Sequence, residues 1–260
     1  MELAYSIAGL VVGFIVGLTG IGGGALMTPI LIVGFGINPL VAVSTDLLYA
    51  AITKFGGVWP YAKKKLVAWK VVGAMLVGSV PGSLVTLWIL SRIDHPETLE
   101  HLINLTLGVS LVLTSVAVFM RNRIREAVIN YHAPELKALA RRWRLPITSL
   151  AGLFLGGLVT LSSVGAGALG TALLILLFPH MTMPMIVATD LVHAVVLTSV
   201  AGVGHWQMGN VDTTLLVYLL IGSLPGVYVG GHLGTRLSPK VMQPIMGSLL
   251  LVIGLRFVIG

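Results

Sequence analysis

Cysteine is absent from this chain of 260 residues, and charged side chains are scarce. The absence of cysteine excludes disulfides, thiolate metal sites and a cysteine nucleophile. Only 10% of the residues are charged, whereas a soluble protein has about 25%. Because 56% of the residues are apolar and the mean hydropathy is +0.99, a water-soluble fold could not bury enough of this surface. We therefore expect an all-α integral membrane protein with the lipid bilayer as its solvent.

Acidic residues are fewer than basic ones, nine against sixteen, which gives a net charge of +7. In a soluble protein this balance indicates a nucleic-acid partner. Here the basic residues gather in a few short loops, as membrane orientation requires, so we expect no nucleic-acid partner. The first residues, MELAYSIAGL, lack a basic region and a small-residue cleavage site, and we interpret them as a retained helix.

The chain contains an internal repeat. The glycine-rich stretch LTGIGGGALMT at 18–28 returns as LSSVGAGALGT at 161–171, which is 143 residues later. Thr45-Asp46-Leu47 returns at 189–191, and the GSVPG motif at 78–82 returns as GSLPG at 222–226, both 144 residues later. Three matches in the same order predict two copies of one unit. We assign 1–120 to the first membrane repeat, 121–146 to a linker and 147–260 to the second repeat.

Each repeat has two short apolar segments joined by its glycine stretch, followed by three longer ones. The segments are 3–18, 25–36, 40–59, 67–90 and 101–120, then 147–160, 166–179, 184–204, 214–235 and 241–259. Those of about 20 residues can span a bilayer. The first two of each repeat are too short to span comfortably, so we expect a Gly-hinged pair of short helices plus three transmembrane helices.

Positive charge predicts the orientation, because Lys and Arg collect in cytoplasmic loops. The lysine-rich loop 60–70 and the arginine-rich linker 121–146 are then cytoplasmic, while 91–101, 205–213 and the N-terminus lie outside. One broken span over 3–36 would place 60–70 outside, so we reject it. A re-entrant hairpin and two full crossings both fit, and charge does not separate them. In either case the second repeat is inverted relative to the first, as in secondary transporters, and the linker is an amphipathic connector on the membrane surface.

The glycine stretches predict an anion site. Glycines leave backbone N–H groups accessible where a new helix begins, and a helix N-terminus attracts anions. Inverted symmetry would bring the two tips together near the bilayer midplane. The predicted substrate-binding residues are Thr19, Gly20, Gly22, Gly23, Gly24, Ser162, Ser163, Gly165 and Gly167. The alternative is that these small residues only allow helices to pack closely.

Four ionisable residues lie within apolar segments: Asp46, Lys54, Asp190 and His193. A charge at the bilayer centre costs about 2.5–3.5 kcal/mol, so such residues are usually functional. Asp190 and His193 share a helical face, and we predict that they carry protons together with Asp46 at the equivalent depth. The alternative for the two aspartates is helix capping. Lys54 either contacts the substrate or reaches toward the cytoplasmic lysines.

The sequence shows no metal-ligand spacing, phosphate-binding loop or other nucleophile–base arrangement. We therefore expect no metal, no cofactor and no enzymatic activity.

Several stretches together resemble the TauE/SafE sulfite exporter family, also called TSUP. They are the two glycine stretches, Asn38-Pro39, the AVSTDLLYAAITK run at 42–54, Gly209–Asp212 and the motif at 222–226. The resemblance covers nearly the whole chain and implies a bacterial inner-membrane protein that moves small sulfur-containing anions or related organic acids. Two features depart from the family. Many members have Ser at the positions of Asp46 and Asp190, and Ser163 and Ala166 dilute the second glycine stretch.

Together these features predict a secondary transporter for small anions such as sulfite, a sulfonate or thiosulfate, coupled to protons. The alternatives are a passive anion channel and a non-transporting membrane assembly subunit. The sequence leaves the direction of transport and the oligomeric state open.

The orientation can be tested with single cysteines, because the chain has none of its own. A cysteine at Lys64 should resist an impermeant thiol reagent in intact cells and react after permeabilisation. A cysteine in the 91–101 loop should react in intact cells and serves as the control. Labelling at position 64 from outside would contradict the predicted orientation.

Overall fold

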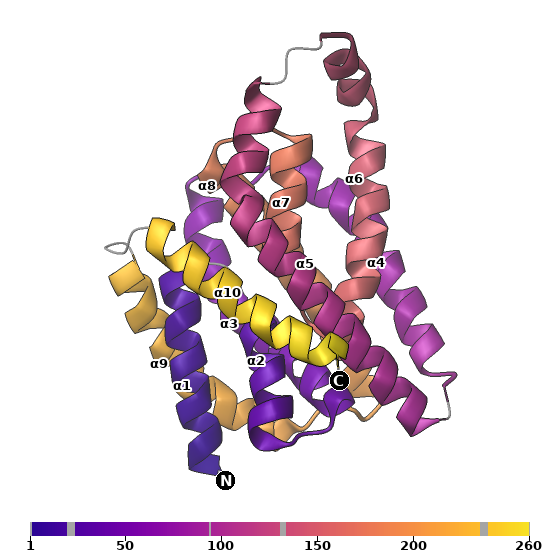
Figure 1. Ribbon diagram of the computed structural model, residues 1–260, viewed down its shortest axis with the longest axis vertical. Helices are drawn as coiled ribbons and strands as arrows, with labels where there is room; N and C mark the ends of the chain where they lie inside the picture. The colour runs from indigo at the N-terminus through magenta and orange to yellow at the C-terminus, as the bar shows by residue number, and fades with distance from the viewer. Residues whose placement is uncertain (1, 20–23, 94, 131–133, 235–238, 260) are drawn as a thin grey trace.

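The structure is a computed structural model that describes residues 2–19, 24–93, 95–130, 134–234 and 239–259, all in helices or short connections (Figure 1). The all-α prediction is confirmed. The helices of the first half are α1 (Glu2–Thr19), α2 (Gly24–Pro29), a π-helical turn (Ile30–Gly34), α3 (Pro39–Lys63), α4 (Trp69–Leu90) and α5 (Pro96–Asn130). Those of the second half are α6 (Pro134–Ser162), α7 (Ala168–Leu177), α8 (Met183–Gln207), α9 (Thr213–Gly234) and α10 (Pro239–Ile259).

Five helices of the described chain are long and apolar enough to cross a membrane. They are α4, α8, α9 and the apolar parts of α5 and α6. The integral membrane class is thereby supported. One expectation is wrong: we took 147–160 as too short to span, but α6 is apolar over the 20 residues Trp143–Ser162. The helix starts inside the predicted linker, and this adds the missing turn.

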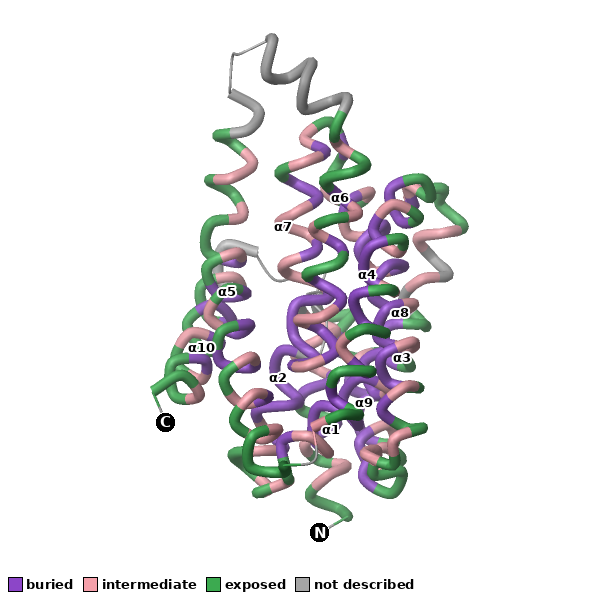
Figure 2. The backbone as a smooth tube through the Cα atoms, turned by 90° about the vertical axis from the view of Figure 1, so that its right-hand side faces the viewer, coloured by how far each residue is buried: buried purple, intermediate pink, exposed green. Residues whose placement is uncertain are grey.

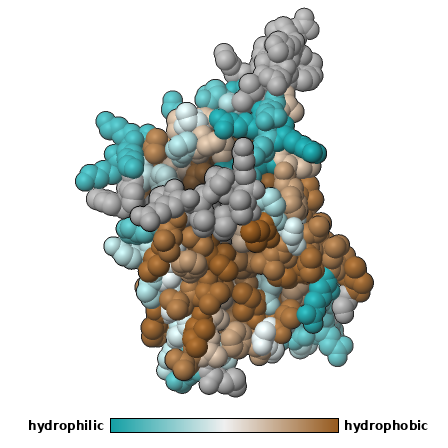
Figure 3. All heavy atoms as spheres, turned by 60° about the vertical axis from the view of Figure 1, so that its left-hand side comes forward, coloured by the Kyte–Doolittle hydropathy of each residue, from teal (hydrophilic) through white to brown (hydrophobic). Residues whose placement is uncertain are grey.

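The surface of the molecule matches a bilayer environment. Figure 3 shows hydrophobic side chains over the middle of one face and hydrophilic side chains toward both ends. Large apolar residues such as Trp88, Phe154 and Tyr228 are more than half exposed. In water this exposure would be costly, but lipid tails solvate such side chains without cost.

The two halves interlock. The first helix of each half packs on the fourth helix of the other, α1 on α9 and α6 on α4. The equivalent helices α3 and α8 pack on each other, and so do α5 and α10. A two-fold relation between the repeats would produce this exchange of partners. The inversion of the second repeat in the membrane stays a prediction.

Glycines bring the exchanged helices together. A Cβ atom at Gly222 or Gly226 of α9 would run into the backbone of α1 at Ser6 and Leu10. In the other half, Gly78 and Gly82 of α4 lie just as close to the backbone of α6 at 149 and 153. Small residues four positions apart permit this close approach in lipid. The twin motifs therefore serve helix packing, and α4 and α9 continue through Pro81 and Pro225.

The segments predicted to lie on opposite sides of the membrane are at opposite ends of the molecule. The start of α1 lies at one end of the long axis, and the end of α5 and the start of α6 lie at the other (Figures 1 and 2). The 121–146 segment is not a separate element. Its described residues are helical and extend α5 and α6 beyond the bundle.

Candidate functional site

The break between α6 and α7 is built by residues of the second glycine stretch. The Ser162 hydroxyl donates to the carbonyl of Leu158 at 2.7 Å and accepts from the N–H of Val164 at 3.2 Å. The backbone then passes through positive φ angles at Ser163 (57°), Gly165 (111°) and Gly167 (144°). Glycine adopts the last two conformations without steric cost. The chain therefore turns within four residues, and α7 begins at Ala168 inside the protein.

Lys54 holds this break from the opposite half. Its ammonium group donates to the carbonyl oxygen of Ala166 at 2.8 Å, and the side chain is only 6% exposed. The hydrogen bond satisfies a carbonyl that no helix can pair, as required of non-helical backbone at membrane depth. The bond also places a positive charge beside the N-terminus of α7, which carries a partial positive charge of its own.

Asp190 faces the same break from α8. One carboxylate oxygen accepts a hydrogen bond from the Thr171 hydroxyl at 2.9 Å. The other oxygen has no hydrogen-bond partner among the described residues. Gly170 allows this approach, because a Cβ atom there would collide with the unpartnered oxygen.

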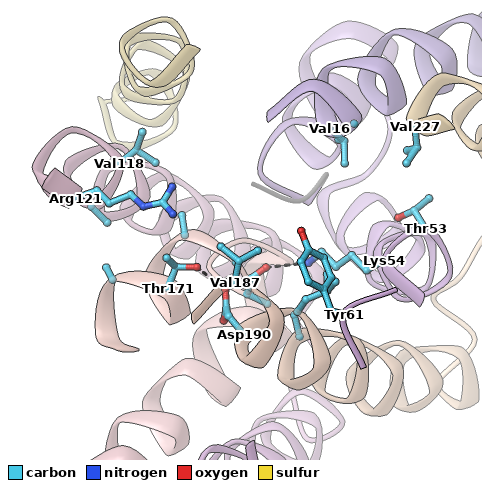
Figure 4. A pocket seen from close by; sticks show the side chains of 18 of the residues that line it. Val16, Thr53, Lys54, Tyr61, Val118, Arg121, Thr171, Val187, Asp190 and Val227 are labelled. Atoms are coloured by element: carbon cyan, nitrogen blue, oxygen red, sulfur yellow. Dashed lines mark hydrogen bonds between the residues drawn. The ribbon is translucent and has the colours of Figure 1, made fainter. Parts of the chain in front are cut away.

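These groups meet in a cavity of about 510 Å³. Its charged lining residues, within the described chain, are Lys54, Arg121 and Asp190. Figure 4 shows the Arg121 and Lys54 side chains, from α5 and α3, reaching toward the space beside Thr171 and Asp190. Tyr61 adds an aromatic wall, and the remaining lining is mostly small and apolar. Two positive charges against one negative charge favour a small anion with an apolar part.

The cavity lies toward the end of the molecule that carries the α5–α6 connection. Tyr61 is near the end of α3, Val187 is in the first turns of α8, and Arg121 is in the last third of α5, which ends at Asn130. Toward the other end, buried hydrogen bonds cross between the helices. Ser44 bonds His205 Nδ1 at 2.9 Å, His205 Nε2 lies 3.1 Å from the carbonyl of Thr160, and the Thr160 hydroxyl donates to Ser83 at 2.7 Å.

The first half contains a counterpart of the Thr171–Asp190 pair. The Thr28 hydroxyl donates to Asp46 at 2.5 Å. Thr28 and Asp46 align with Thr171 and Asp190 in the sequence repeat. Thr28 and Asp46 are completely buried, and neither lines the cavity. The same hydrogen bond therefore occurs twice, once at the cavity wall and once inside the protein.

His193 points away from the cavity. Its Nε2 lies 2.9 Å from the Ser79 hydroxyl of α4, and its Nδ1 has no hydrogen-bond partner among the described residues. His193 shares α8 with Asp190, but its recorded hydrogen bond goes to α4. The expected relay between them stays a prediction.

The predicted site residues lie in several parts of the structure. Lys54, Gly167 and Asp190 meet at the cavity, while Ser163 lies beside Asp46. Ser162 and Gly165 shape the turn. In the first glycine stretch, Thr19 ends α1 and Gly24 begins α2. Gly20, Gly22 and Gly23 lie outside the described residues.

Three residues of the site were missed by sequence reasoning. Thr28 and Thr171 recur at equivalent positions in the repeats, and that recurrence was a usable signal. Arg121 was counted only as a linker charge. Only the packing of α5 shows that its side chain turns inward to the cavity.

Comparison with known proteins gives consistent results. The family model "Sulfite exporter TauE/SafE" matches residues 5–257. The probable membrane transporter protein YjnA of Bacillus subtilis is 38% identical over 99% of this chain and 100% of its own length. Two other probable membrane transporter proteins of that organism, YunE and YdhB, are 25% and 28% identical over 97% and 92% of this chain and 95% and 96% of their own lengths. No solved structure matches the chain significantly.

The two Thr–Asp pairs should differ in their contribution to stability. Thr28→Val removes the hydroxyl group that donates to the fully buried carboxylate of Asp46, which should cost about 1–3 kcal/mol of unfolding free energy. Thr171→Val should cost less, because water in the cavity can replace the lost donor. Thermal unfolding of the two purified variants in detergent measures this difference. Equal losses of unfolding free energy would show that water does not reach Asp190 any more than it reaches Asp46.

Proposed function

Because the chain belongs to the TauE/SafE family of membrane transporters, we propose that it is a proton-coupled secondary transporter for small sulfur-containing anions. The supporting observation is the cavity in which Lys54, Arg121 and the start of α7 face Asp190. The sulfur class comes from the family description and the preference for an anion comes from the charges of the cavity. We propose the bacterial plasma membrane as its location, with the N-terminus outside and the linker in the cytoplasm.

The anion is bound by three positive features of the cavity. Lys54 and Arg121 are the cationic side chains among its described lining residues, and the N-terminus of α7 adds backbone donors at Gly167 and Ala168. The ammonium group of Lys54 is held by a carbonyl rather than by a carboxylate, so its charge is available to a ligand. The apolar walls at Val118, Val187 and Val227 accept the carbon part of an organic sulfonate.

Asp190 couples the anion to a proton. Ionised Asp190 opposes an anion in the same cavity, whereas protonated Asp190 leaves two uncompensated positive charges there. Anion binding therefore favours proton binding, and by linkage the reverse also holds. His193, on the next turn of α8, is the proposed partner that passes the proton toward Ser79.

The described conformation fits one state of an alternating-access cycle. The cavity lies toward the cytoplasmic end in the proposed orientation, and the hydrogen bonds among Ser44, His205, Thr160 and Ser83 lie between it and the outer end. Opening the outer end requires α3 and α8 to separate from α4 and α6, which breaks the contact between His205 Nε2 and the carbonyl of Thr160. A transporter that alternates between this state and one open to the outside exposes the cavity to one side at a time, whereas a passive channel is open to both sides at once.

Counterflow in proteoliposomes tests the function. Vesicles loaded with unlabelled sulfite, thiosulfate, sulfoacetate, taurine or sulfate are diluted into a trace of labelled anion. We expect transient accumulation of label with at least one anion in which sulfur carries the charge. No uptake of label with any of these compounds would contradict the substrate class, and equilibration without accumulation would favour a channel.

The role of Asp190 can be separated from anion binding. Asp190→Asn should abolish accumulation driven by a pH gradient but preserve exchange at equal anion concentrations, because the cations of the cavity remain. Transport with and without an imposed pH gradient measures both properties. An Asp190→Asn protein that still concentrates the anion with the pH gradient would show that Asp190 does not carry the coupling proton.

A further inference from the structure

Buried oxygen atoms without hydrogen-bond partners gather around Asp46, outside the cavity. Asp46 Oδ2 accepts from Thr28, but Oδ1 has no partner among the described residues. The hydroxyl of Ser163 lies beside this carboxylate and also lacks a partner. Asp46 is 0% exposed and Ser163 is 2% exposed. The carboxylate of Asp46 on α3 and the hydroxyl of Ser163 after α6 therefore lie side by side, each with an oxygen atom that accepts no hydrogen bond in the described chain.

A second pair of oxygens continues the cluster along α3. Tyr49 lies one helical turn after Asp46, and its hydroxyl faces that of Ser223 of α9. Both side chains are fully buried, and neither hydroxyl has a hydrogen-bond partner of good geometry in the described chain. Buried polar atoms are almost always satisfied. Four such atoms together indicate a ligand.

The charge of Asp46 indicates a cation. A buried carboxylate must be neutralised by a proton or by a positive ion, since the bare charge costs many kcal/mol. The nearby cation is Lys54, and its ammonium group is bonded to the carbonyl of Ala166. The end of α6 at Ser162 adds the partial negative charge of a helix C-terminus next to Ser163.

A metal cation accounts for more of these atoms than a proton does. A proton on Asp46 would satisfy one additional oxygen, whereas a hard cation binds several carboxylate and hydroxyl oxygens at once. A single carboxylate balances a single positive charge. Broken helices near the membrane midplane hold sodium ions in the same manner in secondary transporters.

The equivalent position in the second half has lost these features. Tyr49 aligns with His193, and Ser163 aligns with Gly20, so two hydroxyl oxygens are missing there. Asp190 faces the positive charges of both Lys54 and Arg121, whereas Lys54 is the cation near Asp46 in the described chain, so a metal cation is repelled more strongly at Asp190. The two Thr–Asp pairs therefore suit different ions.

We propose that Asp46, Ser163, Tyr49 and Ser223 form a site for one sodium ion, which is a second coupling ion of the transporter. The proposal rests on the proposed transport function, because a resident cation next to the α6–α7 break would tie sodium binding to the shape of the anion cavity. The site itself can be tested by binding alone.

Sodium-dependent thermal stability of the purified protein in detergent is the direct test. Sodium chloride is titrated against choline chloride at constant ionic strength and without any sulfur anion. A ligand that binds only the folded protein raises Tm with the logarithm of its concentration. We expect such a rise with sodium and a much smaller one with potassium. An equal rise with potassium and choline, or no rise at all, overturns the proposal.

Variants assign the effect to this cluster. Asp46→Asn should abolish the rise in Tm, while the matched change Asp190→Asn should leave it unaltered. Ser163→Ala and Tyr49→Phe remove one oxygen each and should weaken sodium binding about tenfold, as expected for the loss of one polar contact. These two variants also decide the question if Asp46→Asn does not fold. A rise that persists unweakened in both overturns the assignment.

The outcomes for the site and for transport are distinguishable. If the sodium effect is absent while counterflow of the anion persists, Asp46 binds a proton and the sodium proposal fails alone. If the sodium effect is present and no anion is exchanged, the transport proposal fails and the cation site stands.

Discussion

A polar group inside a bilayer finds no water, so the protein must supply its partner, and the rest of this fold depends on that constraint. The break between α6 and α7 exposes a carbonyl at Ala166 in the interior, and the ammonium group of Lys54 pairs it from the other half. This single contact joins the two repeats at the cavity. It also places a cation beside the N-terminus of α7, so the group that permits the break contributes to the proposed anion site.

Close helix packing makes the contact feasible. The glycines of α4 and α9 let α6 and α1 approach backbone to backbone, and each of these helices belongs to the other repeat. In lipid, helices gain stability from such packing rather than from the hydrophobic effect. In the second half α7 packs against α5 of the first, and the break before α7 is held by Lys54 of α3; Arg121 of α5 and Lys54 both line the cavity.

A repeated hydrogen bond acquires two roles through its surroundings. Thr28–Asp46 and Thr171–Asp190 are chemically the same pair. The second lies at a cavity with two cations, and the first lies among buried hydroxyls. A carboxylate next to cations weakens anion binding when it is ionised and permits it when it is protonated. A carboxylate surrounded by oxygen atoms attracts a positive ion. Divergence of a few neighbouring residues after duplication is sufficient to separate the two proposed functions.

The sequence by itself determined the membrane class, the repeat and the family, and it predicted Asp46, Lys54, Asp190 and the second glycine stretch as site residues. Composition, periodicity and internal repetition are local or statistical properties of the sequence, so they can be recognised without knowing how the helices pack. Only the tertiary structure decided that Lys54 caps Ala166, that Arg121 turns into the cavity, that His193 bonds Ser79 and that α6 is long enough to span. These features depend on which helices exchange partners and how each helix is rotated. Both are fixed by contacts between residues more than a hundred positions apart, as in the Lys54–Ala166 and Ser79–His193 pairs, and no short motif records them.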